Sequence, residues 1–175
     1  MTHSGLIAGA FSALLCVGLA GAPARADVFL DRLAGTWSGK GVVRTTERSP
    51  DEAIRCRLRT SSDSVGGRLS VQGSCSVAGL TLPVTGAITS NGKNYASTVF
   101  QNLARLSSTD FNGRLQGSQL KMDFSGRDLQ TNQDIRAYLT ITTGKDSFNI
   151  SLSRSDPNSG KLFEAGSIRF TAGFN

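Results

Sequence analysis

Apolar and polar residues alternate along most of the chain after residue 34, and this pattern limits the fold more than any other feature. The alternation is clear over residues 54–58, 120–124 and 137–141. A side-chain period of two is typical of β-strands that bury one face. After residue 34 the chain has no long run with the 3.6-residue period of a helix. The pattern therefore predicts an all-β protein.

Short turn signals separate the alternating runs. Glycines follow Asp63, and an Asn-Gly pair stands at residues 91–92. Such turns join neighbouring antiparallel strands. We expect a short helix over 27–33, followed by strands over 37–45, 54–59, 69–75, 78–88, 95–100, 111–115, 120–124, 137–141, 148–152 and 162–172.

An open sheet of that many strands would leave exposed edges, which invite aggregation. The economical solution is an antiparallel up-and-down β-barrel of about eight to ten strands with a short N-terminal helix. A sandwich of two sheets is the structural alternative. In either fold the inward positions mix small residues with large ones. This mixture either fits the taper of a barrel or leaves a cavity for an apolar ligand.

The first 26 residues have the pattern of a signal peptide. Residues 5–20 are almost entirely apolar, and Ala24-Arg25-Ala26 forms a small-x-small cleavage site. We therefore expect a cleaved leader over 1–26 and a single domain over 27–175, located in a periplasm or secreted. The apolar run is short and rich in glycine and alanine, so no transmembrane segment is expected in the mature chain.

Two cysteines remain after the leader, Cys56 and Cys75. An even pair in an exported protein predicts a disulfide. A hairpin that turns at the glycines after Asp63 would bring the two residues opposite each other, as the short reach of an S–S bond requires.

Catalytic residues are scarce. The single histidine, His3, lies in the leader, so the mature chain has no Ser-His-Asp or Cys-His system and lacks the commonest zinc and haem ligand. No zinc spacing, calcium loop or phosphate-binding loop is present, and no two carboxylates are paired on an inward face. We expect no enzyme activity, metal or cofactor.

Three arginines, Arg55, Arg57 and Arg59, share one face of a predicted strand. The formal net charge is +6, and loss of Arg25 with the leader leaves about +5. The arginines form either an anion-binding face or a solvated face that discourages edge pairing. Nucleic acid is disfavoured as a partner, because the protein is expected to be exported and no aromatic residues are interleaved with the arginines.

The Gly35-Thr36-Trp37 sequence, entered from the short helix-like segment, resembles the opening motif of lipocalins and other calycin-like barrels. The resemblance implies that Trp37 is a structural plug at the closed end of the barrel. It also implies that a late arginine, Arg154 or Arg169, packs on the indole.

The segment from Gly35 to Cys75 is also similar to small periplasmic barrels that inhibit secreted metalloproteases. That resemblance implies that the segment before the barrel, residues 27–33, enters a protease cleft.

Three functional hypotheses follow. The first is a non-catalytic exported binding protein that holds a small apolar or amphipathic envelope ligand in a calycin-like barrel. The second is a protein-interaction module such as a protease inhibitor. The third is an envelope-associated protein that contacts an anionic glycan or lipid through Arg55, Arg57 and Arg59.

Overall fold

The computed structural model describes residues 27–63, 66–99, 111–127 and 132–173. The expected leader, 1–26, lies outside these residues. The described residues form one helix and ten strands: α1 (Val28–Arg32), β1 (Gly35–Val43), β2 (Glu52–Asp63), β3 (Arg68–Val77), β4 (Leu80–Ser90), β5 (Tyr95–Ser97), β6 (Phe111–Gln116), β7 (Gln119–Arg127), β8 (Asp134–Thr143), β9 (Ser147–Ser155) and β10 (Leu162–Ala172).

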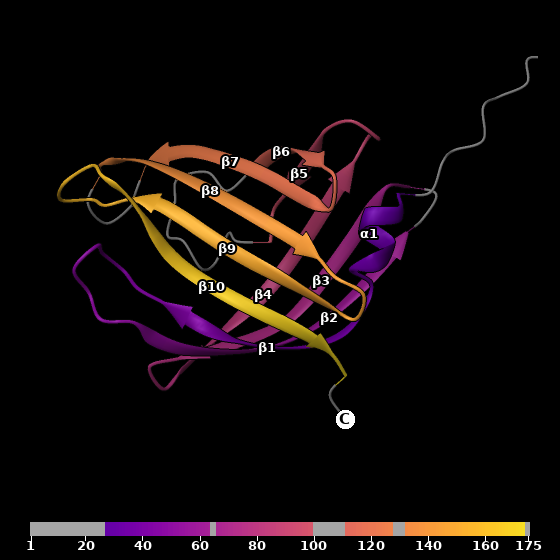
Figure 1. The fold of residues 1–175 in the computed structure, drawn as a ribbon, viewed down its shortest axis with the longest axis horizontal. Helices are drawn as coiled ribbons and strands as arrows, with labels where there is room; N and C mark the ends of the chain where they lie inside the picture. Colours follow the sequence, from indigo (N-terminus) through magenta and orange to yellow (C-terminus); the bar gives the residue numbers. More distant parts are fainter. Residues whose placement is uncertain (1–26, 64–65, 100–110, 128–131, 174–175) are drawn as a thin grey trace, which may run out of the picture.

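The ten strands close into one antiparallel barrel (Figure 1). Each strand pairs with the next in the chain, and β1 pairs with β10, from Trp37 opposite Ala172 to Val43 opposite Gly166. Closure pairs the first and last strands and so leaves no free sheet edge between them. The predicted up-and-down barrel is confirmed, and the sandwich alternative is wrong.

Three of the expected strands extend beyond the observed ones. The first was expected to reach Thr45, but β1 ends at Val43. Ala78 was expected to begin the fourth strand, but it lies in a two-residue turn with Gly79, closed by Val77 opposite Leu80. Both turn residues have positive φ, 50° and 77°, as a hairpin turn that follows the strand twist requires. The strand expected over 95–100 is shorter, since β5 ends at Ser97.

Helix α1 lies at one end of the barrel, which we call the closed end (Figure 1). The Asp27 carboxylate caps the helix by accepting the N–H groups of Phe29 and Leu30, and it also accepts the Tyr95 hydroxyl at 2.8 Å. Burial acts to raise the pKa of Asp27, but hydrogen bonds, from Ser90 and Tyr95 first, outweigh it and lower that pKa. Burial, together with the bond to Asp27, raises the pKa of Tyr95 to about 12. These contacts attach the helix to the barrel.

The Cys56–Cys75 disulfide is confirmed. The two cysteines are directly opposite each other on β2 and β3, and both are buried in the barrel core. The disulfide therefore links two strands that are already paired from Ile54 to Asp63 on β2.

Packing against the core requires a glycine at position 39, one of several glycines in the first strand. Gly39 faces inward on β1, opposite Phe170 on β10. A Cβ at Gly39 would lie 2.5 Å from the Phe170 ring, which is closer than atoms can approach. The absent side chain therefore makes room for a core phenylalanine, while Lys40 points outward.

Candidate functional site

Trp37 lies inside the closed end of the barrel and is 5% exposed. Its indole Nε1 donates to the Leu33 carbonyl at 2.9 Å and to the Thr60 hydroxyl at 3.1 Å. The indole meets Phe148 edge-on, with ring centroids 4.8 Å apart, and Phe148 stacks on Phe170. Packing and hydrogen bonds therefore both hold the ring in place.

Neither arginine considered from the sequence packs on Trp37. Arg169 is exposed and lies directly opposite Lys40, on the outer face of the barrel. Arg154 is six residues from Phe148 along β9, which is about 20 Å at the rise of an extended strand. The expectation of a late arginine on the indole is therefore wrong, because β9 carries Arg154 to the other end of the barrel.

The interior near the closed end is well packed. It holds an apolar void of about 30 Å³, bordered by residues such as Leu33, Leu58 and Phe148. That is about the volume of one water molecule. In this half of the barrel the mixture of small and large residues therefore fits the taper, and this void among the described residues is much smaller than a lipid.

Arg154 points into the barrel at the opposite end, which we call the far end. On β9 it has the same orientation as Phe148, Ile150 and Leu152, which pack in or against the core. Four neighbouring strands align one inward row at this level: Phe124 on β7, Ala137 on β8, Arg154 on β9 and Phe163 on β10. The other three members of the row are buried. A cationic side chain thus lies in an otherwise apolar row.

The Arg154 guanidinium is not neutralised by the described part of the chain. Its Nε is buried and has no hydrogen-bond partner there. The ion pair formed by the described residues, between Arg127 and Asp134, does not include it. A buried polar group without a partner costs about 1–3 kcal/mol. The sequence carried a signal for this site, since Arg154 interrupts the inward series of apolar residues on β9.

A second arginine adjoins the same row. The Arg44 guanidinium carbon lies 5.5 Å from the centroid of the Phe163 ring, which is a cation–π distance. Its Nε also donates to the Glu164 carbonyl at 2.7 Å. Arg44 and Arg154 are both neighbours of Phe163, so positive charge gathers at the far end. No sequence pattern joins these two arginines, because 110 positions separate them.

The Asp156 carboxylate organises the rim beside this row. It accepts the N–H groups of Asn158 and Ser159 within its own turn, and that of Glu47 in the neighbouring β1–β2 connection at 2.7 Å. Asp156 therefore stabilises the β9–β10 turn by bonding the backbone of that turn. The bond from Glu47, more than the others, holds the pKa of Asp156 below its usual 3.8.

Low pH should therefore destabilise the far end of the barrel. A carboxylate whose pKa is lowered by folding adds stability above its unfolded pKa, and this contribution is lost as the pH falls through the folded pKa. We expect the free energy of unfolding to decrease as the pH drops below about 4. Asp156→Asn should lower it at pH 7 and reduce its dependence on pH below pH 4, as measured by urea unfolding across that range. Asp146→Asn, in the exposed turn after β8, is the control and should match the unaltered protein at pH 7. Equal curves for Asp156→Asn and the unaltered protein would contradict this assignment.

The three arginines considered from the sequence lie together on the outer face. Arg55, Arg57 and Arg59 are exposed, while the residues between them face the core. The register adds Lys40 on β1, directly opposite Arg55, and Arg169 on β10, directly opposite Lys40. These two cations were missed from the sequence, because their position beside Arg55 depends on which strands become neighbours.

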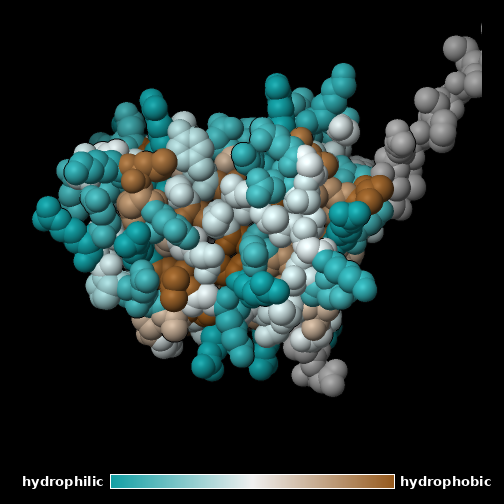
Figure 2. Space-filling view, viewed as in Figure 1, coloured by the Kyte–Doolittle hydropathy of each residue, from teal (hydrophilic) through white to brown (hydrophobic). Residues whose placement is uncertain are grey.

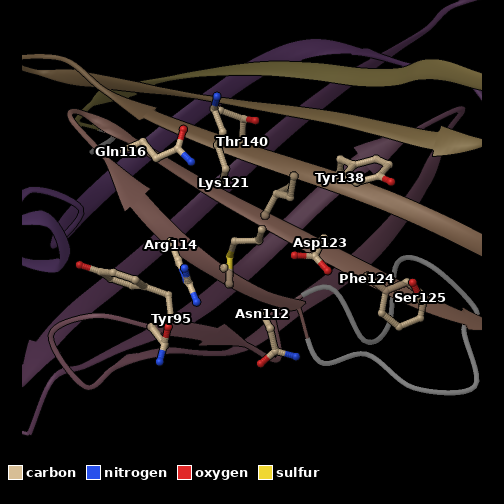
Figure 3. A pocket seen from close by; sticks show the side chains of 14 residues that line it. Tyr95, Asn112, Arg114, Gln116, Lys121, Asp123, Phe124, Ser125, Tyr138 and Thr140 are labelled. Atoms are coloured by element: carbon tan, nitrogen blue, oxygen red, sulfur yellow. The ribbon is translucent and has the colours of Figure 1, made fainter.

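An open hollow of about 750 Å³ lies on the outer face of β6–β8, on another side of the barrel (Figure 3). Its lining includes Arg114, Lys121, Asp123 and Tyr138, which are exposed. Arg114 is directly opposite Lys121, and Asp123 is directly opposite Tyr138. No sequence pattern indicates this hollow, because it depends on how neighbouring strands lie in the barrel. Because its charged groups remain in water, it offers weaker electrostatic recognition than a desolvated cation.

Two further observations concern the described residues. No group of three or more His, Cys, Asp or Glu side chains is placed there to hold a metal ion. No helix among them is long and apolar enough to cross a membrane.

Comparisons with known proteins identify the fold. No family model matches the chain, and no curated protein matches it in sequence. Among solved structures it is similar to Rv2717c from M. tuberculosis, with a TM-score of 0.58 and 11% identity over 85% of this chain and 99% of that one. It is also similar to the S-type phycobiliprotein lyase CPES from Guillardia theta, with a TM-score of 0.54 and 9% identity over 84% of this chain and 92% of that one. The chain therefore shares the barrel fold of these two proteins.

Proposed function

We propose that this protein is a non-catalytic exported binding protein for a small amphipathic ligand with an acidic group. The ligand binds at the far end of the barrel, where Arg154 contacts the acidic group. The observation that carries this proposal is the inward guanidinium of Arg154, whose buried Nε has no partner in the described residues.

Arginine recognises carboxylate and phosphate through two parallel hydrogen bonds, and these are stronger where water is excluded. Arg154 is half-buried, so part of its side chain remains accessible. Phe124 and Phe163 in the same row are buried and place Arg154 among apolar side chains. The void near the closed end is only about 30 Å³, so the apolar part of the ligand is short or remains at the far end.

Arg154 lowers the stability of the fold, because its buried Nε has no partner in the described residues, and this supports a role in binding. An apolar residue of similar length would fill the position without leaving a buried donor unpaired. We therefore expect Arg154→Met to raise the free energy of unfolding by about 1 kcal/mol while removing the affinity for an acidic ligand. Such a trade of stability for function is typical of binding sites.

The test compares two ligands that have the same ten-carbon hydrocarbon chain and different head groups. Decanoate and decanol are titrated into the oxidised protein, and binding is measured by calorimetry. Loss of the charge-assisted hydrogen bonds should make Arg154→Gln bind decanoate about 10-fold to 100-fold more weakly, with decanol unchanged. Arg169→Gln removes the same charge from the outer face and should change neither affinity by more than about twofold.

Two outcomes would overturn the proposal. One is equal decanoate affinity in Arg154→Gln and the unaltered protein. The other is no binding of decanoate together with a native mass spectrum of the purified protein that has no bound adduct. Thermal unfolding of each variant shows whether a loss of binding reflects a loss of structure.

The non-catalytic part of the proposal rests on two residue types. After the leader the chain has no histidine, and both remaining cysteines are used in the disulfide. Export is supported by the leader pattern and by that disulfide, which persists in oxidising compartments. These features suit either a periplasm or the exterior of the cell.

The alternative of a protease inhibitor has less support. It needs residues 27–33 free to enter a cleft, but this segment is helical and buries Phe29, Leu30 and Leu33 at the closed end. Releasing it would expose three core side chains, at a cost of several kcal/mol.

A further inference from the structure

We propose that the outer face of β10, β1 and β2 docks the protein onto an anionic membrane. The surface consists of five cations, which we call the basic band: Lys40, Arg55, Arg57, Arg59 and Arg169. This inference is independent of the ligand site, because the basic band faces away from the barrel interior.

The register brings the five cations together. Arg169, Lys40 and Arg55 are directly opposite one another across three neighbouring strands. Arg57 and Arg59 continue along β2, at steps of about 6.7 Å. All five side chains are exposed. The basic band therefore covers about 10 Å across the strands and about 13 Å along β2.

This arrangement is unfavourable for the barrel alone. Like charges directly opposite each other on paired strands destabilise a sheet. None of the five cations forms an ion pair with a described acidic residue, and the acidic residues of these strands, Glu52, Asp63 and Glu164, lie at or near strand ends. The repulsion is relieved if an external anionic surface lies against the basic band.

The strands on either side of the basic band present small, uncharged polar residues beside it. The outward residues of β3 beyond Arg68 are Ser70, Gln72, Ser74 and Ser76, and those of β9 are Ser147, Asn149, Ser151, Ser153 and Ser155. On the face shown in Figure 2, hydrophobic residues are interspersed with hydrophilic and near-neutral ones. Charge, more than apolar insertion, would therefore drive the contact.

A membrane fits this surface better than a single small anion does. The cations stand on the outside of a barrel wall and are exposed, so each one alone would hold a phosphate weakly in water. A lipid bilayer presents many phosphates at once, and each lysine or arginine near an anionic leaflet strengthens binding by about fivefold. The affinity then comes from many weak contacts with lipid phosphates and does not require a pocket.

The test measures binding to vesicles by sedimentation. The unaltered protein should bind phosphatidylcholine vesicles that contain phosphatidylglycerol, bind pure phosphatidylcholine much less, and dissociate as salt is raised. The triple variant Arg55→Gln, Arg57→Gln, Arg59→Gln should bind the anionic vesicles about 100-fold more weakly. The double variant Lys40→Gln, Arg169→Gln should bind them about 25-fold more weakly.

The matched control removes three cations from another side of the barrel. Arg114→Gln, Lys121→Gln, Arg136→Gln changes the net charge equally, and all three residues are exposed on β6–β8. Equal losses in the two triple variants would show that net charge alone matters and would overturn the proposal. So would equal binding of the unaltered protein to both vesicles, or displacement by inorganic phosphate beyond that caused by chloride at the same ionic strength. Decanoate binding should be unchanged in the basic-band variants, which separates this test from that of Arg154.

Discussion

Replacing Trp37 with alanine should lower the free energy of unfolding by about 4 kcal/mol, the largest effect we expect from a single substitution. The indole is almost fully buried against Phe148, and its Nε1 donates two hydrogen bonds. Its removal leaves a cavity and also leaves the Leu33 carbonyl without this donor. If Trp37 is the structural plug of the closed end, the loss should also free α1, whose last turn ends at that carbonyl.

The measurement is urea unfolding followed by far-UV circular dichroism, since the variant lacks the only tryptophan. Trp37→Phe separates the two contributions, because it keeps an aromatic ring and removes the donor. It should cost less than Trp37→Ala. Tyr138→Ala is the control, since Tyr138 is 44% exposed and should change the free energy by about 0.5 kcal/mol or less. A loss below about 1 kcal/mol for Trp37→Ala would contradict the plug role.

Reduction of the Cys56–Cys75 disulfide should lower the free energy of unfolding by about 3 kcal/mol. The two cysteines are 19 positions apart, and the bond restricts the unfolded chain by closing that loop. Because β2 and β3 are also paired from Ile54 to Asp63, we expect the reduced protein to remain folded at room temperature and to unfold at lower urea.

The comparison uses the same protein with and without dithiothreitol, so that the volume of the two side chains in the core is unchanged. The double variant Cys56→Ala, Cys75→Ala is treated in parallel and should not respond to dithiothreitol. An equal urea midpoint for the oxidised and reduced proteins would show that the disulfide adds nothing beyond the strand pairing.

Local patterns in the sequence were sufficient for most of the barrel. The expected last strand, 162–172, coincides with β10, and the alternation over 120–124 and 137–141 placed the correct faces inward. These predictions succeed because the direction of a strand side chain depends only on its position in the pleat. Ala78 continues the apolar period of the strand, so the period alone misplaces it, whereas the neighbouring Gly79 marks the turn.

The candidate sites depended on more than local pattern. The outward direction of Arg55 and the inward direction of Arg154 both follow from the alternation of their own strands. The alternation does not say what lies beside them. Arg154 was considered as a partner of Trp37, whereas its strand carries it to Ala137 and Phe163.

The sequence by itself determined the strand class, the inward and outward faces, the cysteine pair and the absence of a histidine after His3. Only the tertiary structure decided which distant residues meet. Lys40 and Arg169 become neighbours because the first and last strands pair to close the barrel, and it is also the tertiary structure that leaves the Arg154 Nε without a partner among the described residues. Alternation is a property of one strand, whereas register and neighbours are set by the packing of the whole barrel.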